Sequence, residues 1–205
     1  MLNEIKEHCD QLVTQFDDIP KERKKLLNRI SEYIIERKKA DQPVNLVYIC
    51  THNSRRSHFG QVWSAVAAAY YGISGVRTFS GGTEATAFNP NAIHALEQTG
   101  FRIRKTTEDA NPRYNVRFGE KEFTTCFSKV YDHPENPVSQ FAAIMTCSDA
   151  EENCPFIPGV DLRIGTTYDD PKAFDGTSLQ DQKYLERSEQ IALECLYVFS
   201  NVNQL

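Results

Sequence analysis

Residues 44–57 of the chain read VNLVYICTHNSRRS. The first half, from Val44 to Ile49, is a short apolar run rich in β-branched residues, which predicts a buried parallel strand ending at Cys50. The polar second half leads directly into a helical pattern over residues 57–71. Open α/β sheets place their ligand crevice where such a strand ends. We therefore expect a ligand site at Cys50.

Short apolar runs and helical patterns continue to alternate along the rest of the chain. Further strands are expected over residues 76–80, 141–146 and 160–164, and helices over 90–98 and 180–202. Strands separated by helices imply a parallel, doubly wound sheet. The fold class predicted from these patterns is α/β, with helices flanking the sheet.

Two segments do not follow this alternation. Residues 1–42 carry two amphipathic helical patterns and the composition changes at Asp41-Gln42-Pro43, which predicts a helical N-terminal extension to an α/β domain over 43–205. Residues 111–140 carry two short apolar runs separated by Gly119-Glu120-Lys121, which predicts an inserted hairpin.

Composition excludes several classes of protein. The chain has 205 residues, 40% hydrophobic and 25% charged, as expected of one domain with a short appendage. It contains no apolar run near the roughly 18 residues of a membrane span. A net charge of −5 argues against nucleic-acid binding. The N-terminus lacks the order of a secretory signal, so we expect a cytoplasmic protein, whose six cysteines are reduced unless they are catalytic.

The segment from Cys50 to Ser57 has the residue types of an oxyanion site. Loop amides and the start of the following helix can converge on an anion, and the positive end of that helix favours a thiolate at Cys50. Arg56 can hold a tetrahedral oxyanion with two hydrogen bonds, and Ser57 can donate to the thiolate. The predicted anion-binding residues are Thr51, His52, Asn53, Ser54, Arg55, Arg56 and Ser57.

Chance would produce Cys-x5-Arg-Ser roughly 0.02 times in a chain of this composition. The alternative interpretation is a buried cysteine followed by arginines on an exposed helix start, and the strand-loop-helix context argues against it. The segment resembles the low-molecular-weight protein tyrosine phosphatase superfamily, which implies a four-stranded parallel sheet. A second motif of that family is Asp-Pro. Asp170-Pro171 supplies it, and the resemblance implies that Asp170 is the general acid.

A third segment indicates one branch of the superfamily. Residues 145–155, MTCSDAEENCP, closely resemble the redox segment of thioredoxin-coupled arsenate reductases. The similarity extends to residues 79–84 and 89–93 and covers about 44–110 and 141–202. It implies that the chain reduces arsenate to arsenite with electrons from thioredoxin.

The resemblance also implies a relay among three cysteines. Cys50 attacks arsenate held by the loop and Arg56, while Asp170 protonates the departing water. Cys147 then attacks Cys50, and Cys154 attacks Cys147 to leave a disulfide for thioredoxin. Two alternatives for Cys147 and Cys154 remain: a zinc site, which needs two further ligands, and a pair of unrelated thiols.

Three positions depart from the family pattern: His52 replaces the usual glycine, Arg55 the usual cysteine, and Gln61 a glutamate that helps bind potassium in similar reductases. We predict neither a metal site nor a cofactor.

Two other functions remain open. One is a phosphomonoester hydrolase that forms a phosphocysteine at Cys50 and uses Asp170 as acid and then base. The other is a noncatalytic module that binds an oxyanion or a partner.

Overall fold

The computed structural model describes residues 1–153 and 156–202. Its centre is a four-stranded sheet in the order β2-β1-β6-β7, with every neighbouring pair parallel. The strands are β1 (Val44–Cys50), β2 (Val76–Gly82), β6 (Phe141–Met145) and β7 (Val160–Gly165). The α/β fold with a four-stranded parallel sheet is confirmed.

Strand β1 lies inside the sheet between β2 and β6, and both of its faces are covered. All 7 of its residues are buried. Tyr48 joins the main core with α3 (Arg56–Tyr70) and α6 (Gln180–Val202), whereas Ile49 joins a smaller core on the opposite face. A continuous apolar run suits a parallel strand that is covered on both faces.

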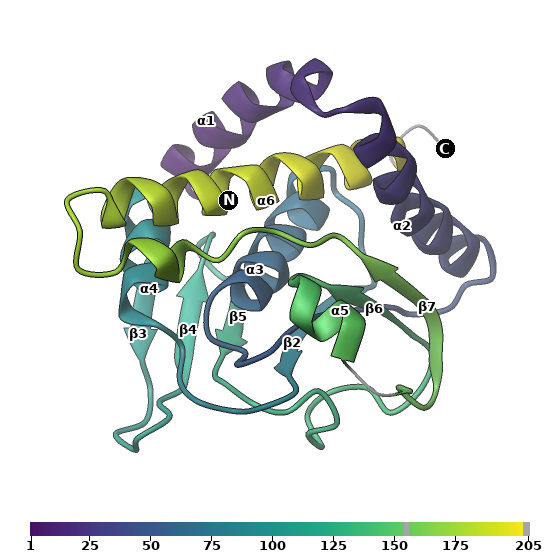
Figure 1. The fold of residues 1–205 in the computed structure, drawn as a ribbon. Helices are drawn as coiled ribbons and strands as arrows, with labels where there is room; N and C mark the ends of the chain where they lie inside the picture. The colour runs from purple at the N-terminus through teal and green to yellow at the C-terminus, as the bar shows by residue number, and fades with distance from the viewer. Residues whose placement is uncertain (154–155, 203–205) are drawn as a thin grey trace.

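The long helix α6 lies across α3 (Figure 1). Trp63 of α3 is fully buried, and its indole Nε1 donates a hydrogen bond to Ser188 Oγ of α6 at 2.9 Å. A buried indole N–H requires such a partner. The remaining helices of the α/β unit are α4 (Pro90–Gln98), the short α5 (Ser148–Asn153) and the 3-10 turn η2 (Pro171–Phe174).

Two helices form in the N-terminal segment: α1 (Asn3–Leu12) and α2 (Lys21–Lys39), joined by a 3-10 turn over Val13–Asp18. Their apolar faces, with Ile5 and Ile30 fully or almost fully buried, join the same core as α3 and α6. The N-terminal segment is thus packed against the last helix of the chain (Figure 1). None of the helices in the described part of the chain is long and apolar enough to span a membrane.

A second, antiparallel sheet has the order β3-β4-β5. Its strands are β3 (Arg102–Lys105), β4 (Tyr114–Arg117) and β5 (Phe123–Cys126). Strands β4 and β5 form a hairpin within the predicted range 111–140. The sequence does not predict β3 because three of its four residues are exposed cations, and only Ile103 packs on the core. Pairing with β4 rather than burial makes this segment a strand.

Gly60 provides a test of how closely α3 packs on β1. A Cβ at this position would collide with the buried ring of Tyr48. We expect Gly60→Ala to lower the free energy of unfolding by about 1–3 kcal/mol in urea titrations, the usual effect of overpacking. Ala69→Ser, at an exposed position of the same helix, should change it by less than about 0.5 kcal/mol. An unchanged unfolding midpoint for Gly60→Ala would contradict this packing.

Candidate active site

Cys50 ends β1, and residues 51–55 turn directly into α3. The thiol is buried, and its Sγ lies 3.1 Å from Ser57 Oγ. Asn53 Nδ2 donates to the same Ser57 oxygen at 2.8 Å. Because that oxygen is already an acceptor from Asn53, the Ser57 hydroxyl proton is available to the Cys50 sulfur.

Asn53 forms the sharp turn of the loop. Its φ of 44° is left-handed, a conformation that asparagine adopts more readily than most residues. Its fully buried side chain also accepts a hydrogen bond from the backbone N–H of Lys129 at 2.9 Å. His52, at the position of the family's usual glycine, has no positive φ. A side chain is therefore accommodated there without that strain, and the His52 ring is half-exposed at 3.7 Å from Glu84.

Gly82 allows the end of β2 to approach this loop. It lies opposite Cys50 in the register of β1 and β2. A Cβ at position 82 would lie 2.6 Å from the carbonyl oxygen of Thr51 and 2.8 Å from the amide nitrogen of Asn53. These are backbone atoms that cannot rotate away, so the loop shape requires glycine here.

The start of α3 is open to an anion. Within the described residues, no side chain caps this helix end. Ser54, just before it, directs its hydroxyl to the carbonyl of Ala87 at 2.8 Å instead. Uncapped N–H groups at the start of a helix are suited to an oxyanion.

Arg56 and Asp170 come from distant parts of the chain and meet beside the loop. Arg56 Nη2 donates to Asp170 Oδ2 at 2.7 Å, and Nη1 donates to the carbonyl of Tyr168 at 2.7 Å. Arg56 Nε is buried without a hydrogen-bond partner in the described structure. A guanidinium held in this way retains an N–H group that can donate a hydrogen bond to an oxyanion in the loop.

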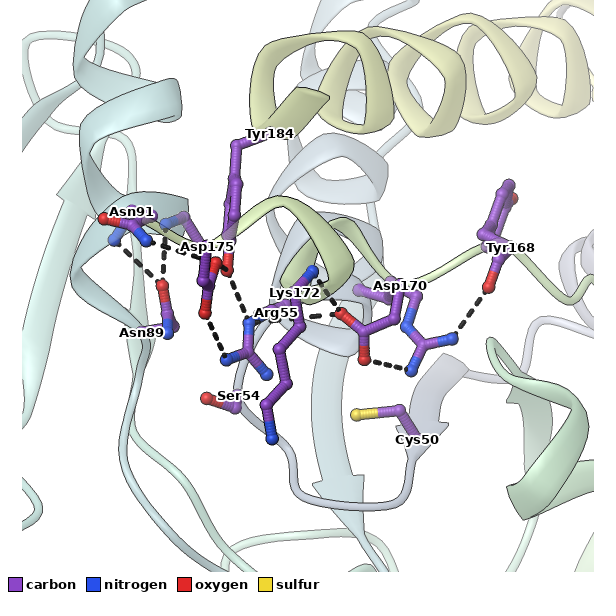
Figure 2. Close-up of polar contacts among 12 residues, drawn as sticks. Cys50, Ser54, Arg55, Asn89, Asn91, Tyr168, Asp170, Lys172, Asp175 and Tyr184 are labelled. Carbon is purple, nitrogen blue, oxygen red and sulfur yellow. Dashed lines mark hydrogen bonds and ion pairs between the residues drawn. The ribbon is translucent and has the colours of Figure 1, made fainter. Parts of the chain in front are cut away.

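Asp170 also begins η2, where its Oδ1 accepts the backbone N–H of Lys172 at 3.0 Å. Figure 2 shows Asp170 and Cys50 at the same end of the site. Asp169 next to it has a fully exposed side chain that lies 3.5 Å from Arg187. Only Asp170 of this pair thus contacts Arg56.

Arg55 lies in a different set of contacts, which sequence reasoning did not predict. Its Nε donates to the hydroxyl of Tyr184 at 2.8 Å, and its guanidinium lies 3.6 Å from Asp175 and 4.0 Å from Asp170 (Figure 2). Tyr184 in turn donates to Asp175 at 2.7 Å. Burial, together with the hydrogen bond to Asp175, raises the pKa of Tyr184. Arg55 therefore joins the start of α3 to η2 and α6.

The parallel pairing of β1 and β6 brings two cysteines to one edge of the sheet. Ile49 lies opposite Met145 in this register, so Cys50 and Cys147 both follow at the carboxyl ends of adjacent strands. Both cysteines belong to the smaller buried core. Sheet topology thus places Cys147 beside the Cys50 loop. Cys154 lies outside the described residues.

Thr51 links the Cys50 loop to the segment after β6. Its Oγ1 donates to Asp149 at 2.7 Å and lies 3.4 Å from the sulfur of Cys147. The backbone N–H of Ala150 donates to that sulfur at 3.3 Å. The Cys147 thiol is therefore held by polar contacts from both segments while remaining buried.

The other three described cysteines are buried away from the Cys50 loop, and the Cys195 thiol accepts a hydrogen bond from Ser64 at 3.3 Å. Burial raises the pKa of Cys9, Cys126 and Cys195 to about 12 in each case. Thiols with such pKa values stay protonated and unreactive at neutral pH. Packing, as predicted, accounts for their positions.

Gln61 is a buried residue of α3 whose side-chain amide is hydrogen-bonded to β5 and β2. Its Nε2 donates to Thr124 Oγ1 and to the carbonyl of Thr125, and its Oε1 accepts from Ser80. Burial holds the pKa of the neighbouring His58 well below its usual range. Within residues 1–153 and 156–202, no three His, Cys, Asp or Glu side chains gather as metal ligands would.

Ser57 provides a test of how Cys50 is activated. Ser57→Ala removes the donor at 3.1 Å, and a hydrogen bond to a charged group contributes about 1.5–3 kcal/mol. We expect iodoacetamide to alkylate Cys50 about tenfold more slowly in Ser57→Ala at neutral pH, as followed by peptide mass spectrometry. Thr86→Val, which removes only a hydroxyl bonded to the His52 carbonyl, should react at the wild-type rate. Equal rates in all three proteins would exclude this role for Ser57.

The chain is similar in sequence to arsenate reductases. It is 26% identical to the enzyme of Bacillus subtilis over 142 residues, which cover 69% of this chain and 84% of that protein. It is 29% identical to arsenate reductase 2 of Staphylococcus epidermidis over 127 residues, 62% of this chain and 77% of the relative. No protein-family model matches the chain.

Solved structures show the same fold at lower identity. An arsenate reductase in its phosphate-binding state superposes with a TM-score of 0.52 at 16% identity, covering 78% of this chain and 98% of the other. A low-molecular-weight protein tyrosine phosphatase from T. tengcongensis superposes with a TM-score of 0.51 at 12% identity, covering 77% and 98%. The chain therefore has the fold of the low-molecular-weight protein tyrosine phosphatases and is similar in sequence to the arsenate reductases that share it.

Proposed function

We propose that this protein is an arsenate reductase that works through a relay of three cysteines. The observation that carries the proposal is the position of Cys147 beside the Cys50 loop, linked to it by Thr51 at 3.4 Å from the Cys147 sulfur. An oxyanion loop alone serves many reactions. A second thiol at the end of the neighbouring strand can attack the arsenic-bound Cys50 sulfur that the first step produces.

In the first step the loop amides, the start of α3 and Arg56 bind arsenate. The Cys50 thiolate attacks arsenic, an S–As bond forms, and one As–O bond breaks. Asp170 supplies the proton with which that oxygen leaves as water. The Arg56–Asp170 contact at 2.7 Å supports the place of Asp170 in the site, because it puts this carboxyl group beside the guanidinium that binds the anion.

In the second step the sulfur of Cys147 attacks the sulfur of Cys50. A Cys50–Cys147 disulfide forms, the S–As bond breaks, and its electron pair stays on arsenic, which is thereby reduced from As(V) to As(III) and released as arsenite. Two thiols supply the two electrons. The burial of Cys147 near Thr51 supports direct transfer, because water is kept from the intermediate.

In the third step Cys154 attacks Cys147, which regenerates the Cys50 thiolate and leaves a Cys147–Cys154 disulfide. We propose thioredoxin as the dithiol that reduces it. The sequence similarity to arsenate reductases and the spacing of Cys147 and Cys154 support this part of the proposal.

Phosphomonoester hydrolysis is the second candidate function. The same contacts favour it: Cys50 would form a phosphocysteine, Arg56 would bind the phosphoryl oxygens, and Asp170 would protonate the leaving alcohol and then take a proton from water. Cys147 and Cys154 have no part in that reaction, so they separate the two candidates.

Asp170 is predicted to be the general acid of either reaction. Asp170→Asn should lower kcat for arsenate reduction or aryl phosphate hydrolysis by about two to four orders of magnitude, the usual contribution of a positioned acid. Phosphate should still inhibit. Asp169→Asn is the matched control, since its side chain is fully exposed and should leave kcat close to wild type. A large loss in Asp169→Asn with none in Asp170→Asn would reverse the assignment.

The relay is tested by the two cysteines that hydrolysis does not use. Cys154→Ser should stop multiple turnovers of arsenate with thioredoxin but leave any aryl phosphatase activity nearly unchanged. After one turnover without reductant, peptide mass spectrometry should find a Cys147–Cys154 disulfide in the wild type and a Cys50–Cys147 disulfide in Cys154→Ser.

Cys126→Ala controls for loss of a cysteine as such, because that thiol is buried in the core with a pKa of about 12. Full arsenate turnover in Cys147→Ser and Cys154→Ser would refute the relay. Cleavage of phosphate esters without any arsenate reduction would leave the hydrolase as the function.

A further inference from the structure

Residues 166–170, here called the acid loop, connect β7 to η2 and end with Asp170. The N–H of Thr166 donates to the carbonyl of Met145 at 2.9 Å, and that of Tyr168 to the carbonyl of Thr146 at 3.1 Å. These bonds attach one side of the acid loop to the end of β6. The other side lies against α2 and α6.

Arg23 of α2 binds this other side of the loop. Its Nη2 donates to the carbonyl of Thr166 at 2.9 Å, and its Cζ lies 4.8 Å from the ring centroid of Tyr168. Its Nε and Nη2 also donate to the two carboxylate oxygens of Glu194, at 2.9 and 2.8 Å. A planar guanidinium can make these contacts together, whereas a lysine ammonium cannot.

Glu194 of α6 completes the cluster. Only 5% of its side chain is exposed, and its Oε2 accepts the hydroxyl of Tyr168 at 2.6 Å. Removing the cation from a buried ion pair is strongly destabilising, so Arg23 stabilises the Glu194 carboxylate that holds Tyr168. The position of the Tyr168 side chain thus depends on a residue of the N-terminal segment.

Tyr168 then acts on the candidate catalytic groups through its backbone. Its carbonyl accepts from Arg56 Nη1 at 2.7 Å, and the other terminal nitrogen of Arg56 binds Asp170 at 2.7 Å. A displacement of Tyr168 would move the acceptor that orients Arg56 and would also move Asp170, two residues further along the same loop.

We infer that Arg23 is a positioning residue for the reaction, through which the N-terminal helices hold the general acid and the anion-binding arginine in their working geometry. The inference rests on the proposed function of Asp170 and Arg56. It gives the N-terminal segment a role in turnover that is exerted through the acid loop.

The first test separates turnover from binding. Arg23→Met should lower kcat about 10- to 100-fold, the effect of a misplaced catalytic group, and raise KM by a smaller factor, because Arg56 is displaced while the loop amides and the start of α3 still bind the anion. Tyr168→Phe, which removes only the hydroxyl bonded to Glu194, should lower kcat in the same direction by a smaller factor. Arg23→Lys should restore only part of the loss, because an ammonium cannot replace the paired contacts.

Arg37→Met is the matched control. Arg37 lies on the same helix, has a side chain that is only 11% exposed, and binds the carbonyl of Pro43 and the side chains of Gln140 and Asp161, away from the acid loop. It should destabilise the fold without changing kcat of the folded enzyme. Equal loss of kcat in Arg37→Met and Arg23→Met would mean that both merely loosen the fold.

A second readout does not depend on activity. Amide hydrogen exchange of the acid loop should be faster in Arg23→Met than in wild type, and unchanged in Arg37→Met. Wild-type kcat and wild-type exchange in a folded Arg23→Met would overturn the inference. If the wild-type protein turns over neither arsenate nor p-nitrophenyl phosphate, the proposed function fails, while the exchange comparison still decides whether Arg23 holds the loop.

Discussion

The parallel pairing of β1 with β6 is the constraint on which the rest of the structure depends. Because the strands run in the same direction and in this register, Cys50 and Cys147 leave the sheet at one edge, although almost a hundred residues separate them in the chain. The pairing is held by burial of β1 on both faces. The positions of the two cysteines are therefore set by the core of the sheet rather than by the loops that follow the strands.

Charged groups beside this edge are arranged in pairs whose members come from different elements. Arg56 meets Asp170, and Arg55 meets Asp175, so both arginines at the start of α3 contact the segment after β7. These contacts hold the Asp-Pro segment over the loop. The pair formed by Arg23 of α2 and Glu194 of α6 likewise joins two elements, one of them an N-terminal helix. An acid loop bound from several directions can keep its carboxyl group in place during a reaction.

Local sequence patterns predict the elements that burial determines. The strand at 44–49, the helix after it and the C-terminal helix all have apolar periodicities that the core requires. Strand β3 and helix α5 are missed: the first is paired but mostly exposed, and the second has only six residues. Patterns of local spacing carry no information on elements of this kind.

The candidate site follows the same division. The Cys-x5-Arg-Ser spacing predicts Cys50 and Arg56, and the family resemblance predicts Asp170, whereas the partners Tyr184 and Glu194 lie on α6 at ordinary helical positions with no local signal. Their roles arise only from tertiary packing. Arg55 was expected to bind the anion. The structure places its charge beside two carboxylates, and its contribution to anion binding stays a prediction.

The central claim is that arsenic is reduced by thiols of this chain. Its most direct test is a thiol count on the denatured wild-type protein after a single turnover of arsenate without external reductant. The relay predicts that the protein loses two of its six thiols for each arsenite formed. Arsenite formed with all six thiols retained, or no arsenite at all from a protein that cleaves phosphate esters, would contradict it.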